Sequence, residues 1–223
     1  MNFKEYPDRE LMMIDLAGVV ASELEDALHH QERATLVVPG GTTPGPMFDD
    51  LCAVHMDWDR VDVMLSDERW LPEDHERSNT RLLKERLLID QASGARYLPL
   101  YAKADMPEDV LAELESVILP VLPISVLVLG MGADMHTASI FPGADNLEKA
   151  LDAHASVLVP MRAPGAPEPR ITLSARVLDQ ALSKHIVITG AEKREALEKA
   201  QKLPASEAPI RAVLSGATIH WAE

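Results

Sequence analysis

Cysteine, basic residues and long apolar runs are all scarce in this sequence of 223 residues. Cys52 is the single cysteine, so no intrachain disulfide can form and metal sites built from several cysteines are excluded. No apolar run approaches the roughly 20 residues that a membrane-spanning helix needs. The N-terminal segment MNFKEYPDRE lacks the basic and apolar regions of a secretory signal peptide. We therefore expect a cytoplasmic protein that does not associate with membranes.

The shortage of basic residues leaves a formal net charge of −15, from 21 Lys and Arg against 36 Asp and Glu. Proteins that bind nucleic acid use clustered Lys and Arg to displace counterions, so this charge argues against a nucleic-acid partner. It does not exclude a small anionic ligand, because surface charges beyond a Debye length of about 8 Å are mostly screened at physiological salt. A local basic cluster can still bind phosphate.

Strands alternate with helices along the chain, and the length suits one α/β domain over residues 1–223. The apolar patterns predict strands over 35–40, 61–67, 124–130, 155–161, 185–190 and 218–222. Helices are expected over 8–31, 43–51, 80–88, 108–119, 173–182 and 191–202. The central strands, such as ISVLVLG, are continuously apolar, which is typical of a parallel sheet covered by helices on both faces.

Three of these strands end in glycine or an acid and run into a polar loop: VVPGGTTPG, VMLSDER and VLGMGADMH. Ligands of open parallel sheets bind outside the carboxyl ends of the strands. We therefore expect these three loops to converge, together with a fourth loop, VITGAEK, which carries Lys193.

Two glycine-rich turns were compared with nucleotide-binding motifs. GGTTPG (40–45) has the outer glycines of a P-loop, but Pro46 and Met47 stand where Lys and Ser or Thr are required. Such a turn still offers free N–H groups to an anion at a helix N-terminus, and an ordinary strand-to-helix turn is the alternative. GMGADM (130–135) lacks the third glycine of the dinucleotide fingerprint, so it is a weak indication of NAD binding.

His136 follows the second of these turns and lies two residues after Asp134. A carboxylate beside an imidazole can orient it as a general base, although most isolated histidines are surface or capping residues. Arg69, Arg170 and Lys193 suit phosphate binding, with surface ion pairs as the alternative for each. No histidine pair has HExxH spacing and no serine lies in a G-x-S-x-G turn, so the sequence supports neither a metal site nor a serine hydrolase.

Five segments, taken in order, resemble the 6-phosphogluconolactonases of the pentose phosphate pathway. SDERWLPEDHERSNTRLL resembles their D-E-R-x-[VL]-P…S-N segment, and LGMGADMHTASIFPG resembles their G-M-G-x-D-G-H-T-A-S-[LI]-F-P-G signature. VVPGGTTPGPMFDDL is similar to their glycine-rich loop, and PRITLS and VITGAEKREAL are similar to two later motifs. Glucosamine-6-phosphate deaminases share the glycine loop but carry D-E-Y and G-H-I-A-F-N-E-P, which this sequence lacks.

The resemblance implies a three-layer α/β/α fold with a mostly parallel sheet, related to the sugar-phosphate isomerases and to Rossmann folds. It implies hydrolysis of a phosphosugar lactone, 6-phospho-D-glucono-1,5-lactone, without a metal or cofactor, by a monomer or small homo-oligomer. His136 would be the general base and Asp134 would orient it. The residues implied to bind substrate are Gly40, Gly41, Thr42, Thr43, Asp67, Arg69, Arg170 and Lys193.

Met135 is the departure from the family pattern, which usually has glycine at this position. Glycine there permits a positive φ or a close approach of backbone to substrate. The methionine either has an ordinary φ and packs aside, or it narrows the pocket. A deaminase or isomerase acting on an amino-sugar phosphate, and a non-catalytic sugar-phosphate-binding protein, remain alternatives to the lactonase.

Overall fold

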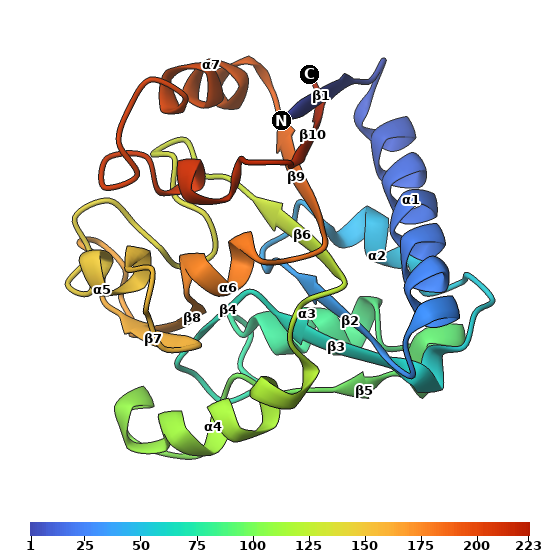
Figure 1. The fold of residues 1–223 in the computed structure, drawn as a ribbon, viewed down its shortest axis with the longest axis horizontal. Coiled ribbons are helices and arrows are strands. Elements are labelled where there is room, and N and C mark those ends of the chain that lie inside the picture. Colours follow the sequence, from blue (N-terminus) through green and yellow to red (C-terminus); the bar gives the residue numbers. More distant parts are fainter.

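The computed structural model describes all residues, 1–223, and contains one large and one small β-sheet (Figure 1). The large sheet has seven strands in the order β1-β10-β9-β6-β2-β3-β5, and every neighbouring pair is parallel. Its strands are β1 (Asn2–Glu5), β2 (Ala34–Val38), β3 (Val61–Leu65), β5 (Arg96–Tyr97), β6 (Val126–Gly130), β9 (Ser183–Thr189) and β10 (Thr218–Ala222).

Helices cover the large sheet on both sides, as the continuously apolar strands predict. Figure 1 shows α1 and α2 on one side and α6, together with the small sheet, on the other. The helices are α1 (Arg9–His30), α2 (Gly45–Leu51), α3 (Asn79–Arg86), α4 (Leu111–Ile118), α5 (Leu147–Leu151), α6 (Ala175–Asp179) and α7 (Ala191–Ala200). The expected three-layer α/β fold with a mostly parallel sheet is therefore confirmed.

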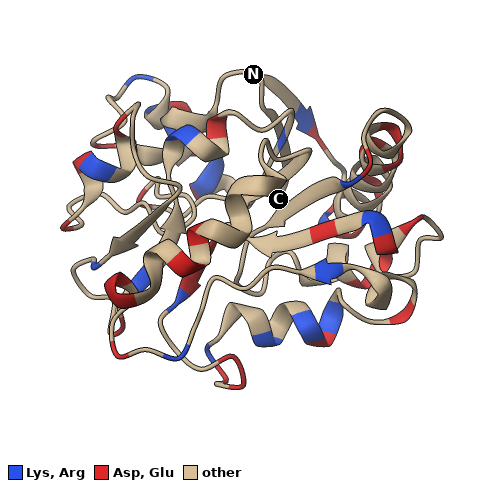
Figure 2. Ribbon diagram, turned by 60° about the horizontal axis from the view of Figure 1, so that its bottom comes forward, with Lys and Arg blue, Asp and Glu red and all other residues tan.

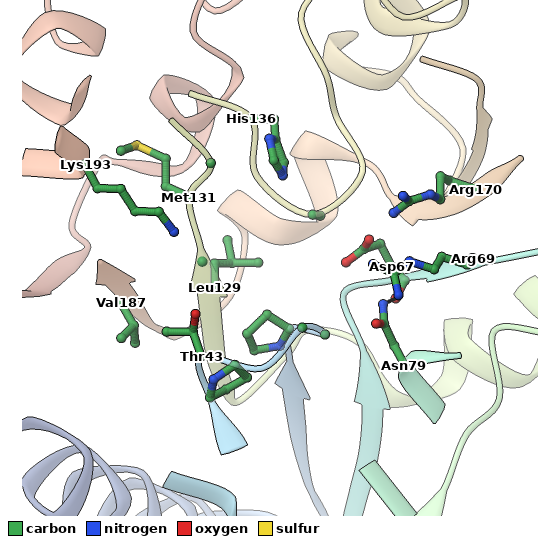
Figure 3. Close-up of a pocket in the computed structure, with 17 residues that line it drawn as sticks. Thr43, Asp67, Arg69, Asn79, Leu129, Met131, His136, Arg170, Val187 and Lys193 are labelled. Carbon is green, nitrogen blue, oxygen red and sulfur yellow. Dashed lines mark hydrogen bonds between the residues drawn. The ribbon is translucent and has the colours of Figure 1, made fainter. Parts of the chain in front are cut away.

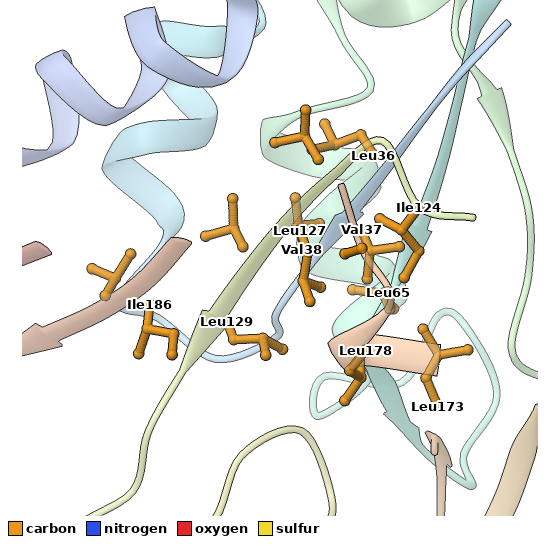
Figure 4. Packing of buried hydrophobic residues seen from close by; sticks show 14 of the residues in the cluster. Leu36, Val37, Val38, Leu65, Ile124, Leu127, Leu129, Leu173, Leu178 and Ile186 are labelled. Atoms are coloured by element: carbon orange, nitrogen blue, oxygen red, sulfur yellow. The ribbon is translucent and has the colours of Figure 1, made fainter. Parts of the chain in front are cut away.

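The core lies between these layers and is built from the central strands. All five residues of β2 and all five of β3 are buried, so both faces of these strands are covered. Leu36, Leu127 and Ile186 come from three neighbouring strands and pack side by side (Figure 4). This packing holds the carboxyl ends of β2, β6 and β9 at one edge, where their loops meet.

The small sheet is antiparallel, in the order β4-β8-β7, and it corrects two sequence predictions. The strand expected over 61–67 ends at Leu65, and β4 (Asp67–Arg69) leaves the large sheet to pair with β8 (Arg170–Leu173). The strand expected over 155–161 is β7 (Leu158–Met161), which also pairs with β8. A polar strand of three residues has no apolar pattern, so β4 was mistaken for the start of a loop.

Several other boundaries differ from the predictions for local reasons. β1 was missed because it is an edge strand with all four residues exposed, and β5 because it has only two residues. β8 was missed because it follows a proline-rich loop, and α5 because it has only five residues. The helix expected over 108–119 begins with a 3₁₀ turn and becomes α-helical only at Leu111. The helix expected over 173–182 is limited to α6.

Charged residues of both signs are spread over the molecule. Figure 2 shows acidic residues on most helices and in the loops, with the basic residues distributed among them. None of the helices combines the length and the apolar character that crossing a bilayer requires.

Candidate active site

A pocket opens at the carboxyl ends of β2, β6 and β9, beside β4 and the first residue of α3. The loops that the sequence analysis expected to converge do meet here. Eight of the ten predicted site residues line the pocket, namely Gly40, Gly41, Thr43, Asp67, Arg69, His136, Arg170 and Lys193. Thr42 and Asp134 do not line it. Asp134 lies behind His136, and Thr42 belongs to the glycine loop.

His136 and Asp134 form a hydrogen-bonded pair in the turn after β6. His136 Nδ1 lies 2.5 Å from Asp134 Oδ1, and the backbone N–H of His136 donates to the same oxygen at 3.1 Å. The hydrogen bond from His136 lowers the pKa of the Asp134 carboxyl, opposing the effect of its burial. With Nδ1–H donated to Asp134, the neutral imidazole has its Nε2 lone pair available to accept a proton.

Gly132 makes room for this pair. A Cβ atom at residue 132 would lie 2.2 Å from the Nδ1 and Cε1 atoms of His136 and 2.6 Å from Asp134 Oδ1. The same glycine closes the turn, because its N–H donates to the His136 carbonyl at 3.0 Å and its carbonyl accepts from Met135 N at 2.9 Å. Any side chain at this position would displace the imidazole, the carboxylate or both.

Met135 lies within this turn and has a φ of +67°. The side chain packs against the hydrophobic core and does not line the pocket. Its carbonyl accepts a hydrogen bond from Ile210 N at 3.0 Å, which fixes the peptide in this conformation. The turn has therefore kept the left-handed backbone that favours glycine, and the methionine neither relaxes it nor narrows the pocket.

The glycine loop and α7 form one end of the pocket. Gly41 has a φ of +80°, in the region that favours glycine, and the loop leads into α2. Lys193 lies in the first turn of α7 and points into the pocket, on the same side as Thr43 (Figure 3). This end therefore offers backbone N–H groups, a threonine hydroxyl and one positive charge.

Asp67, Arg69 and Arg170 lie at the other end, across the pocket from Lys193 (Figure 3). Arg69 and Arg170 are direct partners in the antiparallel β4–β8 register. Like charges opposite one another destabilise a sheet pair, so an anion nearby stabilises this arrangement. The buried Glu168 is one such anion, 3.8 Å from Arg69 Nε. Burial lowers the pKa of Arg170, which the negative charge of Asp67 opposes.

The carboxylate of Asp67 is itself held by two hydroxyl groups. Ser66 Oγ donates to Oδ1 at 2.8 Å, and Ser139 Oγ donates to Oδ2 at 2.5 Å. Ser139 follows His136 by three residues in the turn after β6. This hydrogen bond therefore joins the turn that carries the histidine to the strand that carries Arg69.

Asn79 and Glu68 are two residues of this region that the sequence analysis did not single out. Asn79 lines the pocket, and its side chain packs so closely on Gly40 that a Cβ there would lie 2.0 Å from Asn79 Cγ. Glu68 is fully buried and accepts from the backbone N–H groups of Asn79 at 2.9 Å and Thr80 at 2.8 Å. Burial raises the pKa of Glu68 against the effect of these donors. The S-N pair in the SDER segment was the available signal for Asn79.

The arrangement provides a base, positive charge and backbone donors around one cavity. No group of three or more His, Cys, Asp or Glu side chains is placed to hold a metal ion. Such a site can activate a water molecule beside an anionic ligand whose charge is held at a distance from the base.

Comparisons with known proteins agree with this architecture. A 6-phosphogluconolactonase of Mesorhizobium japonicum is 42% identical over 230 residues, covering 99% of this chain and 95% of the relative. One from Pseudomonas aeruginosa is 42% identical over 211 residues, covering 92% and 88%. The crystal structure of a 6-phosphogluconolactonase from Shewanella baltica matches with a TM-score of 0.96 at 33% identity, covering 100% of this chain and 98% of that one. The family model of glucosamine-6-phosphate isomerases/6-phosphogluconolactonase matches residues 7–221, and the chain belongs to this family.

Proposed function

We propose that this protein hydrolyses 6-phospho-D-glucono-1,5-lactone to 6-phospho-D-gluconate, a step of the oxidative pentose phosphate pathway. The observation that carries the proposal is the His136–Asp134 pair in a pocket with positive charge at both ends. Relatives about 42% identical to this chain bear the name of this lactonase. The D-E-R segment, Asp67 to Arg69, supports the same choice over an amino-sugar phosphate deaminase.

In the proposed mechanism His136 is the general base. Its Nε2 takes a proton from water while the water oxygen attacks the lactone carbonyl carbon. The tetrahedral intermediate then collapses with cleavage of the bond between that carbon and the ring oxygen. The imidazolium returns its proton to the departing ring oxygen, which leaves the open-chain acid and the neutral histidine. Asp134 stabilises the imidazolium and keeps Nδ1 protonated.

The remaining residues bind and orient the substrate. Lys193 and the loop from Gly40 to Thr43 hold the phosphate, while Asp67 and Arg69 face the sugar hydroxyls. Arg170, beside them, supplies positive charge for the oxyanion that develops on the carbonyl oxygen. Phosphate binding at a distance from the reacting carbon supplies energy that orients the ring for attack. The step needs no metal and no covalent nucleophile.

The alternative of a non-catalytic binding protein rested on Met135 spoiling the turn. The methionine side chain lies outside the pocket, and His136 and Asp134 keep their hydrogen bond. The position of Met135 therefore gives no reason to expect a loss of catalysis.

The test is the loss of freshly made lactone in the presence of wild-type protein and of His136→Ala. The substitution is expected to lower kcat by roughly 10²- to 10⁴-fold, the usual contribution of a positioned base, with an unchanged melting temperature. His29→Ala, at an exposed position on α1, is the matched control and should retain full activity. Full activity of His136→Ala would overturn the assigned role, and release of ammonia from glucosamine 6-phosphate would instead indicate a deaminase.

A further inference from the structure

Lys193 and its neighbour Arg194 point in different directions from the first turn of α7. Lys193 lines the pocket, whereas Arg194 does not. The guanidinium carbon of Arg194 lies 4.5 Å from the centroid of the Trp221 ring and 5.2 Å from that of Phe3. Its Nη1 also lies 3.3 Å from a carboxylate oxygen of Glu5. Arg194 therefore attaches the start of α7 to β1 and β10.

Trp221 makes a second attachment, to the residue that precedes α7. Its indole N–H donates to the carbonyl of Gly190 at 3.0 Å, and the N–H of Gly190 donates to the carbonyl of Ala222 at 2.8 Å. The Gly190 carbonyl also accepts from Arg194 N at 3.3 Å, the first hydrogen bond of the helix. Gly190 has a φ of +83°, so these contacts fix a backbone conformation that L side chains rarely adopt.

These contacts determine where α7 begins and how its first turn is rotated. A lysine is a point charge on a flexible stem, so the position of its Cα decides which atoms the ammonium group can reach. The indole of Trp221 is largely buried, at 7% exposure, and lies outside the pocket. A shift of α7 would move Lys193 while leaving His136, Arg69 and Arg170 in place, because those three come from other elements.

We infer that Arg194 and Trp221 are positioning residues for phosphate recognition: they hold the first turn of α7 so that Lys193 reaches the phosphate group. This inference rests on the proposed function, and specifically on the role of Lys193 there. It assigns no contact with substrate to either residue. Its consequence is that loss of either attachment weakens binding of phosphorylated ligands and leaves the chemistry at the lactone carbonyl unchanged.

The test uses Arg194→Met, which keeps the apolar stem and removes the charge, and Trp221→Phe, which keeps an aromatic ring and removes the indole donor. Each is assayed with 6-phosphogluconolactone and with unphosphorylated glucono-1,5-lactone. We expect KM for the phosphorylated lactone to rise about threefold to tenfold, corresponding to the usual strength of a cation–π contact, with kcat essentially unchanged. The value of kcat/KM for the unphosphorylated lactone should stay at the wild-type level.

Two further variants make the result specific. Lys193→Met should raise KM for the phosphorylated lactone alone. Lys4→Met removes an ion pair with Asp15 and a cation–π contact with Tyr6 from the same edge strand, and it should change neither lactone reaction. The dissociation constants of 6-phosphogluconate and gluconate, measured by calorimetry, give the same comparison without turnover.

Three outcomes contradict the inference. They are an equal loss with both lactones, no change with either, and an unchanged KM in Lys193→Met. A wild-type protein that binds 6-phosphogluconate but does not hydrolyse the lactone would refute the proposed function instead. In that case the calorimetric comparison of phosphorylated and unphosphorylated ligands still decides whether Arg194 and Trp221 position Lys193.

Discussion

The left-handed backbone at Met135 has an energetic consequence at the scale of one residue. At a φ of +67°, an L side chain is disfavoured by roughly 1–2 kcal/mol relative to glycine. The peptide is nevertheless held by Ile210 N on one side and Gly132 O on the other. The side chain recovers part of this energy by packing against the core.

Comparing Met135→Gly with Met135→Ala isolates the backbone contribution, because both variants lose the packed side chain. We expect the glycine variant to be more stable than the alanine variant by about 1 kcal/mol. Urea unfolding measures the difference. At Gly18, which lies within α1 with free space around it, the order should reverse in favour of alanine. A more stable alanine variant at position 135 would contradict the left-handed conformation. Lactonase activity should be the same in both Met135 variants, since the side chain lies outside the pocket.

Gly132 gives a second prediction, about catalysis. Gly132→Ala places a Cβ within 2.2 Å of the His136 ring, so the imidazole or the turn must move. A displacement of about 1 Å in a catalytic group commonly lowers the rate by about 10²-fold, and we expect a loss of kcat of that order. Gly18→Ala is the control and should keep wild-type kinetics. Wild-type kcat in Gly132→Ala would show that His136 is not held in the arrangement described.

A chain of buried polar groups joins α1 to the sheet, and it acts at the scale of elements. Glu23 contacts His185 (2.7 Å), which contacts His220 (3.0 Å), which contacts the hydroxyl of Tyr6 (2.7 Å). Asp15 on α1 accepts from Tyr6 and from Lys4 at the other end of the chain. The network connects β1, α1, β9 and β10 without entering the pocket.

This network predicts a loss of stability in mild acid. Burial lowers the pKa of His220 to about 4, from 6.5, with the neighbouring His185 adding to the effect. The unfolded chain therefore binds a proton that the folded chain does not between pH 6.5 and about 4, and stability falls as the pH falls through this window. The lowered pKa values of Glu23 and Asp15 extend the loss below pH 4.5 and 3.8 respectively.

Unfolding in urea at pH 7 and pH 5 tests the contribution of His220. Wild type should lose about 2 kcal/mol more on acidification than His220→Gln, which cannot bind the proton. His55→Ala, at an exposed position outside the network, is the control and should behave as wild type. An equal loss in wild type and His220→Gln would mean that His220 is protonated in the folded protein at pH 5.

The elements that could be predicted from sequence are those whose pattern follows from burial. β2, β3, β6 and β9 are covered on both faces and therefore read as apolar runs. The small sheet escaped because β4 carries Asp67 and Arg69 toward the pocket and pairs with a segment about 100 residues later. Pairing over such a distance leaves no local pattern, and neither do the buried donors that hold Glu68.

At the scale of the whole molecule, the motifs were recognisable although the contacts between them were not. The loops after β2, β6 and β9 each carry glycine and polar residues, and parallel strands bring their carboxyl ends to one edge. The contacts that join those loops to other parts of the chain, such as Ser139 with Asp67 and Gly40 with Asn79, depend on packing between distant segments. Sequence reasoning therefore reached the residues that face the pocket more readily than those that support them.

The position of β10 between β1 and β9 links the order of synthesis to the order of folding. β1 is among the first residues made, yet its only strand partner spans residues 218–222. During translation β1 must wait for nearly the whole chain, and the attachment of α7 through Trp221 must wait as long. A nascent chain can therefore assemble β2, β3 and β6 well before it can place Lys193, so the charge proposed to hold phosphate is among the last parts of the site to reach its final position.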